Sequence, residues 1–245
     1  MDGPAEQSGS KAERAFRDLS AAEALRALYI DFEGEKDRPP VLLGAHRRGR
    51  GPRPYVHAYL VDEAFAVFGD TALTLHGAIQ RIVGRAEARD RTIVAWSTHE
   101  LAIVRELLAD DPDLVARFEA RFVNALALAR YWRNKLHDGD RPAASRLAEY
   151  LALIDYQVPE DGHGGNVGDT IRAIRKTLER GAPPTDHQQE RWRRLVEHNR
   201  HDCIGMRRLC VRATRELDQG GPVRSTGPGW AVSSSRAREV ATRCN

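Results

Sequence analysis

Two carboxylates one residue apart, Asp31 and Glu33, stand at the end of an apolar run that begins at Leu28. Because side chains alternate between the two faces of a strand, both acids lie on one face, while Leu28, Ile30 and Phe32 lie on the other. Adjacent buried acids need a cation, and carboxylate oxygens are the ligands that Mg²⁺ and Mn²⁺ prefer. The pair therefore predicts part of a metal site, or else an edge strand whose acids face solvent.

A third acid, Glu100, follows a short apolar segment, residues 92 to 96, that has the character of a buried strand. A helix is expected to begin at His99. The carboxyl ends of strands carry the functional groups of most α/β sheets, which makes Glu100 a candidate site residue. An acid in the first turn of a helix also stabilises the helix dipole and cap without any chemistry, so both interpretations remain open.

A fourth acid, Asp202, lies on a long helix that we expect to begin near Gln188. His198 is four residues earlier and therefore shares a helical face with Asp202. Imidazole titrates near neutrality, so His198 could act as a general base beside a metal-binding carboxylate. The same spacing is also consistent with an ordinary surface contact.

Composition narrows the class of protein. The chain has 245 residues, 38 basic against 35 acidic, and a net charge of +3, so no overall field indicates a polyanionic partner. Its 3 cysteines show no zinc-ligand spacing, and an odd number argues against a disulfide framework. No apolar run is long enough for a membrane span and the first residues do not resemble a signal peptide. We expect a soluble, cytoplasmic protein.

The chain reads as one domain with loose ends. Residues 1–18 and 218–245 are polar and lack apolar periodicity, so we expect disorder there and a domain over residues 19–217. Strands are expected over residues 28–34, 41–45, 55–61, 92–96 and 121–124. Helices are expected over residues 71–88, from His99 to Leu108, and over most of the chain from about 125 to 217. This order predicts an α/β fold with a mixed sheet, whose first three strands are antiparallel and whose later strands are parallel, flanked by helices.

Three short segments, residues 29–34, 96–100 and 198–203, resemble in their order and context the DEDD exonuclease group of the ribonuclease H-like superfamily. The last segment is most similar to the Tyr-Asn-x-x-Asp-Cys signature of YprB-like nucleases, which occur in or beside RecB-type nuclease proteins. That family commonly has glutamate in its second motif, as this chain has at Glu100. The resemblance covers about residues 26–217 and implies a ribonuclease H-like fold.

The resemblance assigns Asp31, Glu33, Glu100 and Asp202 to the binding of two Mg²⁺ or Mn²⁺ ions, with Asp31 bridging them. It implies 3′–5′ exonuclease activity on single-stranded DNA or RNA. One ion would activate a water molecule and the other would stabilise the leaving 3′ oxygen.

The fifth assigned catalytic residue, His198, fits the family pattern poorly. It occupies the position of the tyrosine found in one branch of the family, whereas the histidine-bearing branch would place its histidine at Glu197. Asn124 stands where relatives often have an acid, either as a polar contact or as a neutral turn residue.

Arginines and aromatic residues are the candidate contacts for nucleic acid. Aromatic candidates for base stacking are Tyr29, Trp96 and Trp132, with core packing as the alternative. Several of the arginines must simply be solvated. The phosphate candidates are Arg47, Arg48, Arg50, Arg172, Arg175, Arg193 and Arg194.

Two rival interpretations remain. The chain could be a ribonuclease H-like module that binds nucleic acid or protein with weak or absent cleavage, since fold does not guarantee activity. Its acids could also be coincidental, in which case divalent ions would not stabilise it. All four acidic positions are filled, which favours the enzyme.

Overall fold

The computed structural model describes residues 19–47, 55–69, 72–137, 146–158 and 166–220. The predicted loose segment 1–18 and all but the first residues of the predicted tail lie outside these ranges. The last helix continues to Gln219, and Gly220 ends it in a left-handed conformation with φ 68°. This helix therefore extends slightly past residue 217, where the predicted domain ends.

A five-stranded mixed sheet forms the centre of the molecule, in the order β3-β2-β1-β4-β5. β1 is antiparallel to β2, which is antiparallel to β3, whereas β4 is parallel to both β1 and β5. The predicted α/β fold with antiparallel strands first and parallel strands later is thus confirmed. The strands are β1 (Leu28–Glu33), β2 (Leu42–Arg47), β3 (Tyr55–Leu60), β4 (Ile93–Ala95) and β5 (Phe122–Asn124).

β1 is a central strand, hydrogen-bonded to β2 on one side and β4 on the other. The alternative of an edge strand carrying solvated acids is therefore wrong. Leu28 and Ile30 pack on one face of the sheet, whereas Tyr29 packs on the opposite face. Because Asp31 and Glu33 have the same parity as Tyr29, their side chains also leave β1 on that opposite face.

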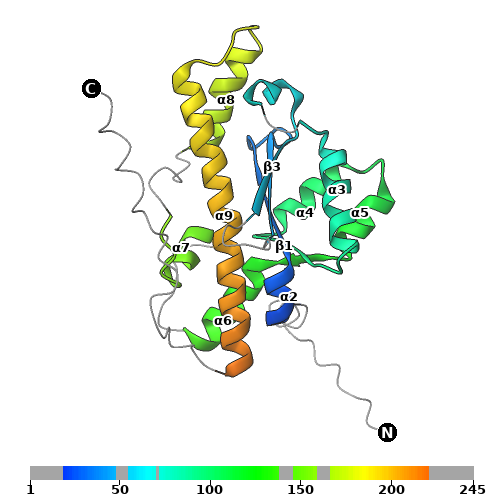
Figure 1. The fold of residues 1–245 in the computed structure, drawn as a ribbon, viewed down its shortest axis with the longest axis vertical. Helices are drawn as coiled ribbons and strands as arrows, with labels where there is room; N and C mark the ends of the chain where they lie inside the picture. The colour runs from blue at the N-terminus through cyan, green and yellow to red at the C-terminus, as the bar shows by residue number, and fades with distance from the viewer. Residues whose placement is uncertain (1–18, 48–54, 70–71, 138–145, 159–165, 221–245) are drawn as a thin grey trace, which may run out of the picture.

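Helices cover both faces of the sheet (Figure 1). α3, α4 and α5 cover one face, and α9 crosses the other face together with α2, α6 and α7. Three short helices, α2, η1 and α5, lie where no helix was predicted. The helices are α2 (Ala21–Arg26), the 3₁₀ helix η1 (Glu63–Phe68), α3 (Leu75–Glu87), α4 (His99–Leu107), α5 (Pro112–Glu119), α6 (Ala125–Leu136), α7 (Leu147–Ala152), α8 (Val167–Leu178) and α9 (Asp186–Gln219).

α9 is the element that brings the late motif to the sheet. It has 34 residues and is therefore about 50 Å long. A capping box starts it: the Thr185 hydroxyl accepts from the Gln188 amide at 3.3 Å, and the Gln188 side chain accepts from the Thr185 amide at 3.0 Å. Leu195, Asn199 and Met206 are buried at helical spacing, so one face of α9 lies against β1 and β2.

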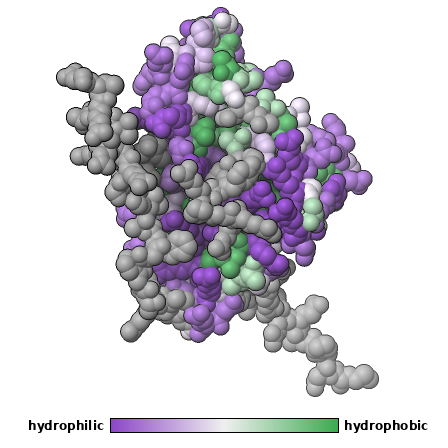
Figure 2. Space-filling model, in the orientation of Figure 1, coloured by the Kyte–Doolittle hydropathy of each residue, from purple (hydrophilic) through white to green (hydrophobic). Residues whose placement is uncertain are grey.

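No helix of the described ranges is long and apolar enough to cross a membrane. The face seen in Figure 2 is mostly hydrophilic, and apolar residues gather near the top of that view, where η1 and α8 lie in Figure 1. Further apolar areas appear in the centre and the lower part of this view (Figure 2). Val67 of η1 is an exposed apolar residue, with 56% of its area exposed.

Candidate active site

Four acids from three separate elements come together on the α9 side of the sheet. Asp31 and Glu33 belong to β1, Glu100 to the first turn of α4 just beyond β4, and Asp202 to α9. These four residues are called the acidic cluster below. Glu33 and Glu100 are buried, with 7% and 6% of their areas exposed. Since β1 and β4 are parallel, the acids meet at the carboxyl ends of these strands.

Of the four acids, Asp31 and Glu33 of β1 have the most strongly raised pKa values. Burial raises the pKa of Asp31 well above its ordinary value, and the negative charges of Glu33, Asp202 and Glu100 raise it further. Burial also raises the pKa of Glu33 to about 7, although the charge of His198 acts in the opposite direction. Both carboxylates are therefore costly to ionise without a nearby cation.

Glu100 has a structural role beside its place in the acidic cluster. Its Oε2 accepts hydrogen bonds from the Ser97 backbone amide at 3.3 Å and from the Ser97 hydroxyl at 3.2 Å. Burial raises the Glu100 pKa in spite of these bonds. Thr98 is the N-cap residue of α4 but makes no side-chain cap bond, so Glu100 takes part in satisfying this helix end. Glu100 thus helps to cap α4 and also lies in the acidic cluster.

His198 lies beside Asp202, with 3.6 Å between His198 Nε2 and Asp202 Oδ2. Burial raises the Asp202 pKa, and the charge of His198 opposes that shift. Glu197 points about 100° away around the helix and lies 3.4 Å from Arg200. His198, and not Glu197, is therefore the neighbour of the acidic cluster, while its role as a base stays a prediction.

Asn199 is a site residue that the sequence reasoning missed. Its Nδ2 donates to Asp31 Oδ2 at 2.9 Å and to the Asp31 carbonyl oxygen at 3.1 Å. Only 1% of Asn199 is exposed. An amide at a position where the helical spacing from Leu195 calls for an apolar residue was the available signal.

The Cys203 thiol is fully buried beneath the same four acids. Burial raises its pKa well above the ordinary value, and the negative charges of all four members of the acidic cluster raise it further. A thiol in this environment stays protonated and unreactive.

The donor chemistry of the acidic cluster fits a hard divalent cation, because all four donors are carboxylates and a cation would relieve their mutual repulsion. As the side chains stand, no three His, Cys, Asp or Glu residues among those described are arranged to hold a metal ion. The residue types therefore suit Mg²⁺ or Mn²⁺, and a ligand shell requires side-chain movements within the cluster.

The predicted phosphate contacts are scattered. Arg48 and Arg50 lie outside the described residues, and Arg47 ends β2 at the opposite end of β1 from Glu33. Arg175 is ion-paired with Glu35 at 2.8 Å and Asp62 at 2.7 Å, which ties α8 to η1 and the β1–β2 loop. A phosphate would have to displace these carboxylates from Arg175.

The three other predicted arginines also have acidic partners. Arg172 lies 2.8 Å from Asp169, and Arg193 and Arg194 each lie 2.9 Å from Glu190. These pairs are exposed, so each contributes little to stability and can be exchanged for a phosphate at low cost. Of the five predicted arginines that the structure describes, these three are therefore the ones that the structure shows in exposed, exchangeable ion pairs.

Two of the three aromatic candidates for base stacking belong to the core. Tyr29 and Trp132 are fully buried, and each donates a hydrogen bond inside the protein, Tyr29 to the Ala24 carbonyl at 2.6 Å. Trp96 is partly buried, with its ring centroid 5.4 Å from that of Tyr150 in an edge-on contact. Tyr29 and Trp132 are thus unavailable to a nucleic-acid base.

Asn124 acts as a turn residue at a helix start. It is the N-cap of α6, and its side chain accepts a hydrogen bond from the Ala127 amide at 3.3 Å. These contacts of Asn124 are therefore those of a neutral turn residue.

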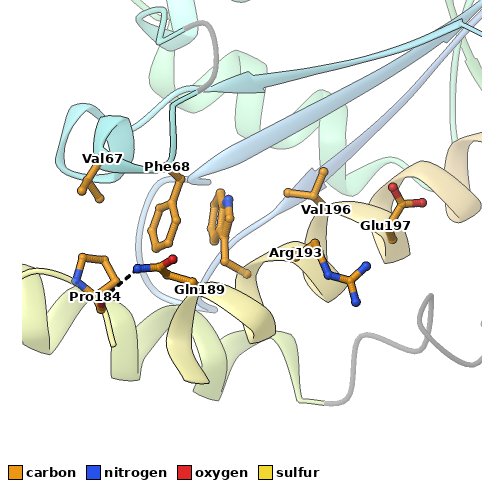
Figure 3. A pocket seen from close by; sticks show the side chains of 8 residues that line it. Val67, Phe68, Pro184, Gln189, Arg193, Val196 and Glu197 are labelled. Atoms are coloured by element: carbon orange, nitrogen blue, oxygen red, sulfur yellow. Dashed lines mark hydrogen bonds between the residues drawn. The ribbon is translucent and has the colours of Figure 1, made fainter. Parts of the chain in front are cut away.

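A shallow groove lies between η1 and the first turns of α9 (Figure 3). The Phe68 and Trp192 rings stack there with centroids 4.6 Å apart, and Arg193 and Glu197 lie on its rim. No member of the acidic cluster lines this groove. The groove is thus a separate feature on another flank of α9.

No protein-family model matches the chain, and neither the curated proteins nor the solved structures compared with it include a match. Its function is therefore inferred from its own residues.

Proposed function

We propose that this chain is a divalent-metal-dependent nuclease with a ribonuclease H-like fold, and that it hydrolyses phosphodiester bonds in single-stranded DNA or RNA from the 3′ end. One observation carries the proposal: the buried acids Glu33 and Glu100 and the half-buried Asp202 all raise the cost of ionising Asp31. A strand order with three antiparallel strands and two parallel ones fits the same proposal.

Asp31, Glu33, Glu100 and Asp202 would hold the Mg²⁺ or Mn²⁺ ions. Bound ions supply the activation of a water molecule and the neutralisation of charge on the leaving 3′ oxygen. Asp31 is the central ligand, because the charges of the three other acids all act on it. Glu33 and Asp202 approach it from the end of β1 and from α9, and Glu100 from the end of β4.

His198 is the residue proposed to accept a proton from the attacking water. Its imidazole lies 3.6 Å from Asp202. Histidine is the side chain that most often transfers protons in enzyme active sites, which suits this assignment.

A ribonuclease H-like binding or interaction module is the second candidate. The observation in its favour is that the described side chains do not already form a ligand set for a metal ion. A binding module of this type predicts that Mn²⁺ neither stabilises the protein nor supports cleavage. An enzyme with an adaptable site predicts both effects.

The activity can be tested with 5′-labelled single-stranded DNA and RNA in the presence of Mn²⁺ or Mg²⁺. The wild type should give a ladder of products shortened from the 3′ end. Asp31→Ala and Asp202→Ala should remove this ladder while the thermal unfolding transition remains cooperative. Glu106→Ala, which removes an exposed acid on the same helix as Glu100, is the matched control and should retain activity. Equal degradation by wild type and Asp31→Ala would overturn the proposal.

A further inference from the structure

Gly44 of β2 is the cross-strand partner of Asp31, and it lies directly beneath Asn199. A Cβ atom added to Gly44 would lie 1.8 Å from Asn199 Oδ1 and 2.8 Å from Asn199 Cγ. Such distances are far inside van der Waals contact, so no residue with a side chain fits here while Asn199 keeps its place. The φ angle of Gly44 is not positive, so backbone conformation does not explain why this position is a glycine.

The space above Gly44 lets the Asn199 amide reach β1. Its Nδ2 donates both to the carboxylate and to the carbonyl oxygen of Asp31, and its side chain also hydrogen-bonds to Glu33. One amide therefore fixes both the backbone and the side chain of Asp31. Because Asn199 is 1% exposed, water does not compete for these bonds.

We propose that Asn199 is a positioning residue that holds the Asp31 carboxylate within the acidic cluster, and that position 44 is glycine to admit the Asn199 amide. The steric part of this inference concerns the fold alone. The positioning part rests on the proposed function, because it assumes that the Asp31 carboxylate serves as a metal ligand. The two parts make separate predictions.

A double-mutant cycle tests the steric part without any metal or substrate. Gly44→Ala should destabilise the protein strongly when Asn199 is present, because the new methyl group collides with the amide. In the Asn199→Ala background the same change should cost much less, because the shorter side chain leaves room for it. Equal costs in the two backgrounds, measured by urea unfolding, would overturn the steric part.

Gly84 of α3 provides the matched control for this cycle. A Cβ atom added to Gly84 meets nothing within 4 Å. Gly84→Ala should therefore be neutral or stabilising, as usual for a helix, and should add to the effect of Asn199→Ala.

A Mn²⁺ titration of thermal stability, without nucleic acid, tests the positioning part. Asn199→Leu keeps a side chain of similar size without the donating amide, and Asn199→Ala removes the group. Both variants should raise the Mn²⁺ concentration needed for half of the maximal increase in Tm by about 10-fold or more, as is usual when a partner of a metal ligand is lost. A purely structural role would lower Tm in the absence of metal and leave this half-point unchanged, which would overturn the positioning role.

The failure of the proposed function would be recognised separately. If Mn²⁺ does not stabilise the wild type at all, the metal-dependent nuclease and the positioning role fail together. The coupling between Gly44 and Asn199 would still be decided by the double-mutant cycle.

Discussion

Buried carboxylates occur at two places along α9, and they are treated in opposite ways. Near the end of the helix, Glu216 is fully buried and accepts hydrogen bonds from Trp132 Nε1 at 2.7 Å, Arg212 Nε at 2.8 Å and His137 Nε2 at 3.1 Å. Burial would raise the pKa of Glu216, but these three partners lower it below its ordinary value. The protein itself thus stabilises the charge of Glu216.

The acidic cluster differs: Asn199 donates to Asp31 and Ser97 donates to Glu100, yet the pKa of both acids stays raised. Every principal influence on Asp31 raises its pKa: burial first, then the charges of Glu33, Asp202 and Glu100. Donors of the chain compensate the charge of Glu216, whereas burial and three acidic neighbours oppose the charge of Asp31. Acids with perturbed pKa values of this kind are typical of functional sites.

Asp31→Asn and Glu216→Gln should separate the two places most clearly. Asp31→Asn should reduce Mn²⁺-dependent cleavage by about 10³-fold, because it removes the charge at the centre of the acidic cluster. The same variant should be at least as stable as the wild type without metal, because repulsion is relieved. Glu216→Gln should leave the specific activity of the folded protein unchanged. Initial rates of cleavage per folded protein measure both effects. An equal loss of activity in the two variants would show that Asp31 and Glu216 do not differ in function.

The free energy of unfolding should be lowered more by Glu216→Gln than by Asp31→Asn, the reverse of their order in activity. Glu216→Gln should lower the free energy of unfolding by about 3 kcal/mol, because Arg212 loses its carboxylate partner inside the protein. Urea unfolding of the metal-free protein measures this loss. A loss for Asp31→Asn as large as that for Glu216→Gln would show that Asp31 is structural.

The pH dependence of stability offers a subtler comparison. Folding raises the Glu33 pKa from 4.5 to about 7, so the folded state binds this proton more tightly than the unfolded chain does. The resulting stabilisation is complete below pH 4.5 and is lost as the pH rises through 7. Between pH 5 and pH 8 the metal-free protein should therefore lose about 2 kcal/mol of stability.

Glu33→Gln is the control for that pH dependence, because a neutral amide does not titrate in this range. The variant should show a flatter profile of unfolding free energy between pH 5 and pH 8. Retention of the full slope would assign it to other groups. Glu216 should not contribute to the slope, because its lowered pKa places its own titration at more acidic pH.

The effect of metal should grow as the cluster loses its protons. Mn²⁺ at 100 times its dissociation constant should stabilise the wild type by about 2.7 kcal/mol. The increase in Tm caused by a fixed Mn²⁺ concentration should be larger at pH 8 than at pH 6, because protons and metal compete for the same carboxylates. Thermal unfolding at the two pH values measures this difference, and an equal increase at both would argue against binding at the cluster.

Local features of the site followed from the sequence. The alternation of β1 placed Asp31 and Glu33 on one face, and helical spacing placed His198 beside Asp202, because each depends only on the geometry of one element. The mixed sheet, antiparallel in its first three strands and parallel in its later ones, could be expected from the succession of strands and helices, although the short helices α2, η1 and α5 were missed. Each of these has at most eight residues, which is too short for a clear apolar period.

Contacts between residues far apart in the chain could not be predicted from the spacing of residues in the sequence. That Glu100 and Asp202 belong with Asp31 was suggested only by the family resemblance, since their approach depends on how β4 and α9 meet β1. The Gly44 and Asn199 contact depends on the register of β2 against β1 and on where α9 crosses both strands. A one-residue shift of that register would turn another side chain toward α9, and sequence spacing does not specify it.

The number of Mn²⁺ ions bound per chain tests the central claim most directly. Free Mn²⁺ can be measured by electron paramagnetic resonance during a titration of the metal-free protein at pH 8. The wild type should bind two ions, Asp31→Asn should lose this binding, and Glu216→Gln should retain both ions. Binding that is absent from the wild type, or unchanged in Asp31→Asn, would contradict a metal centre at the acidic cluster.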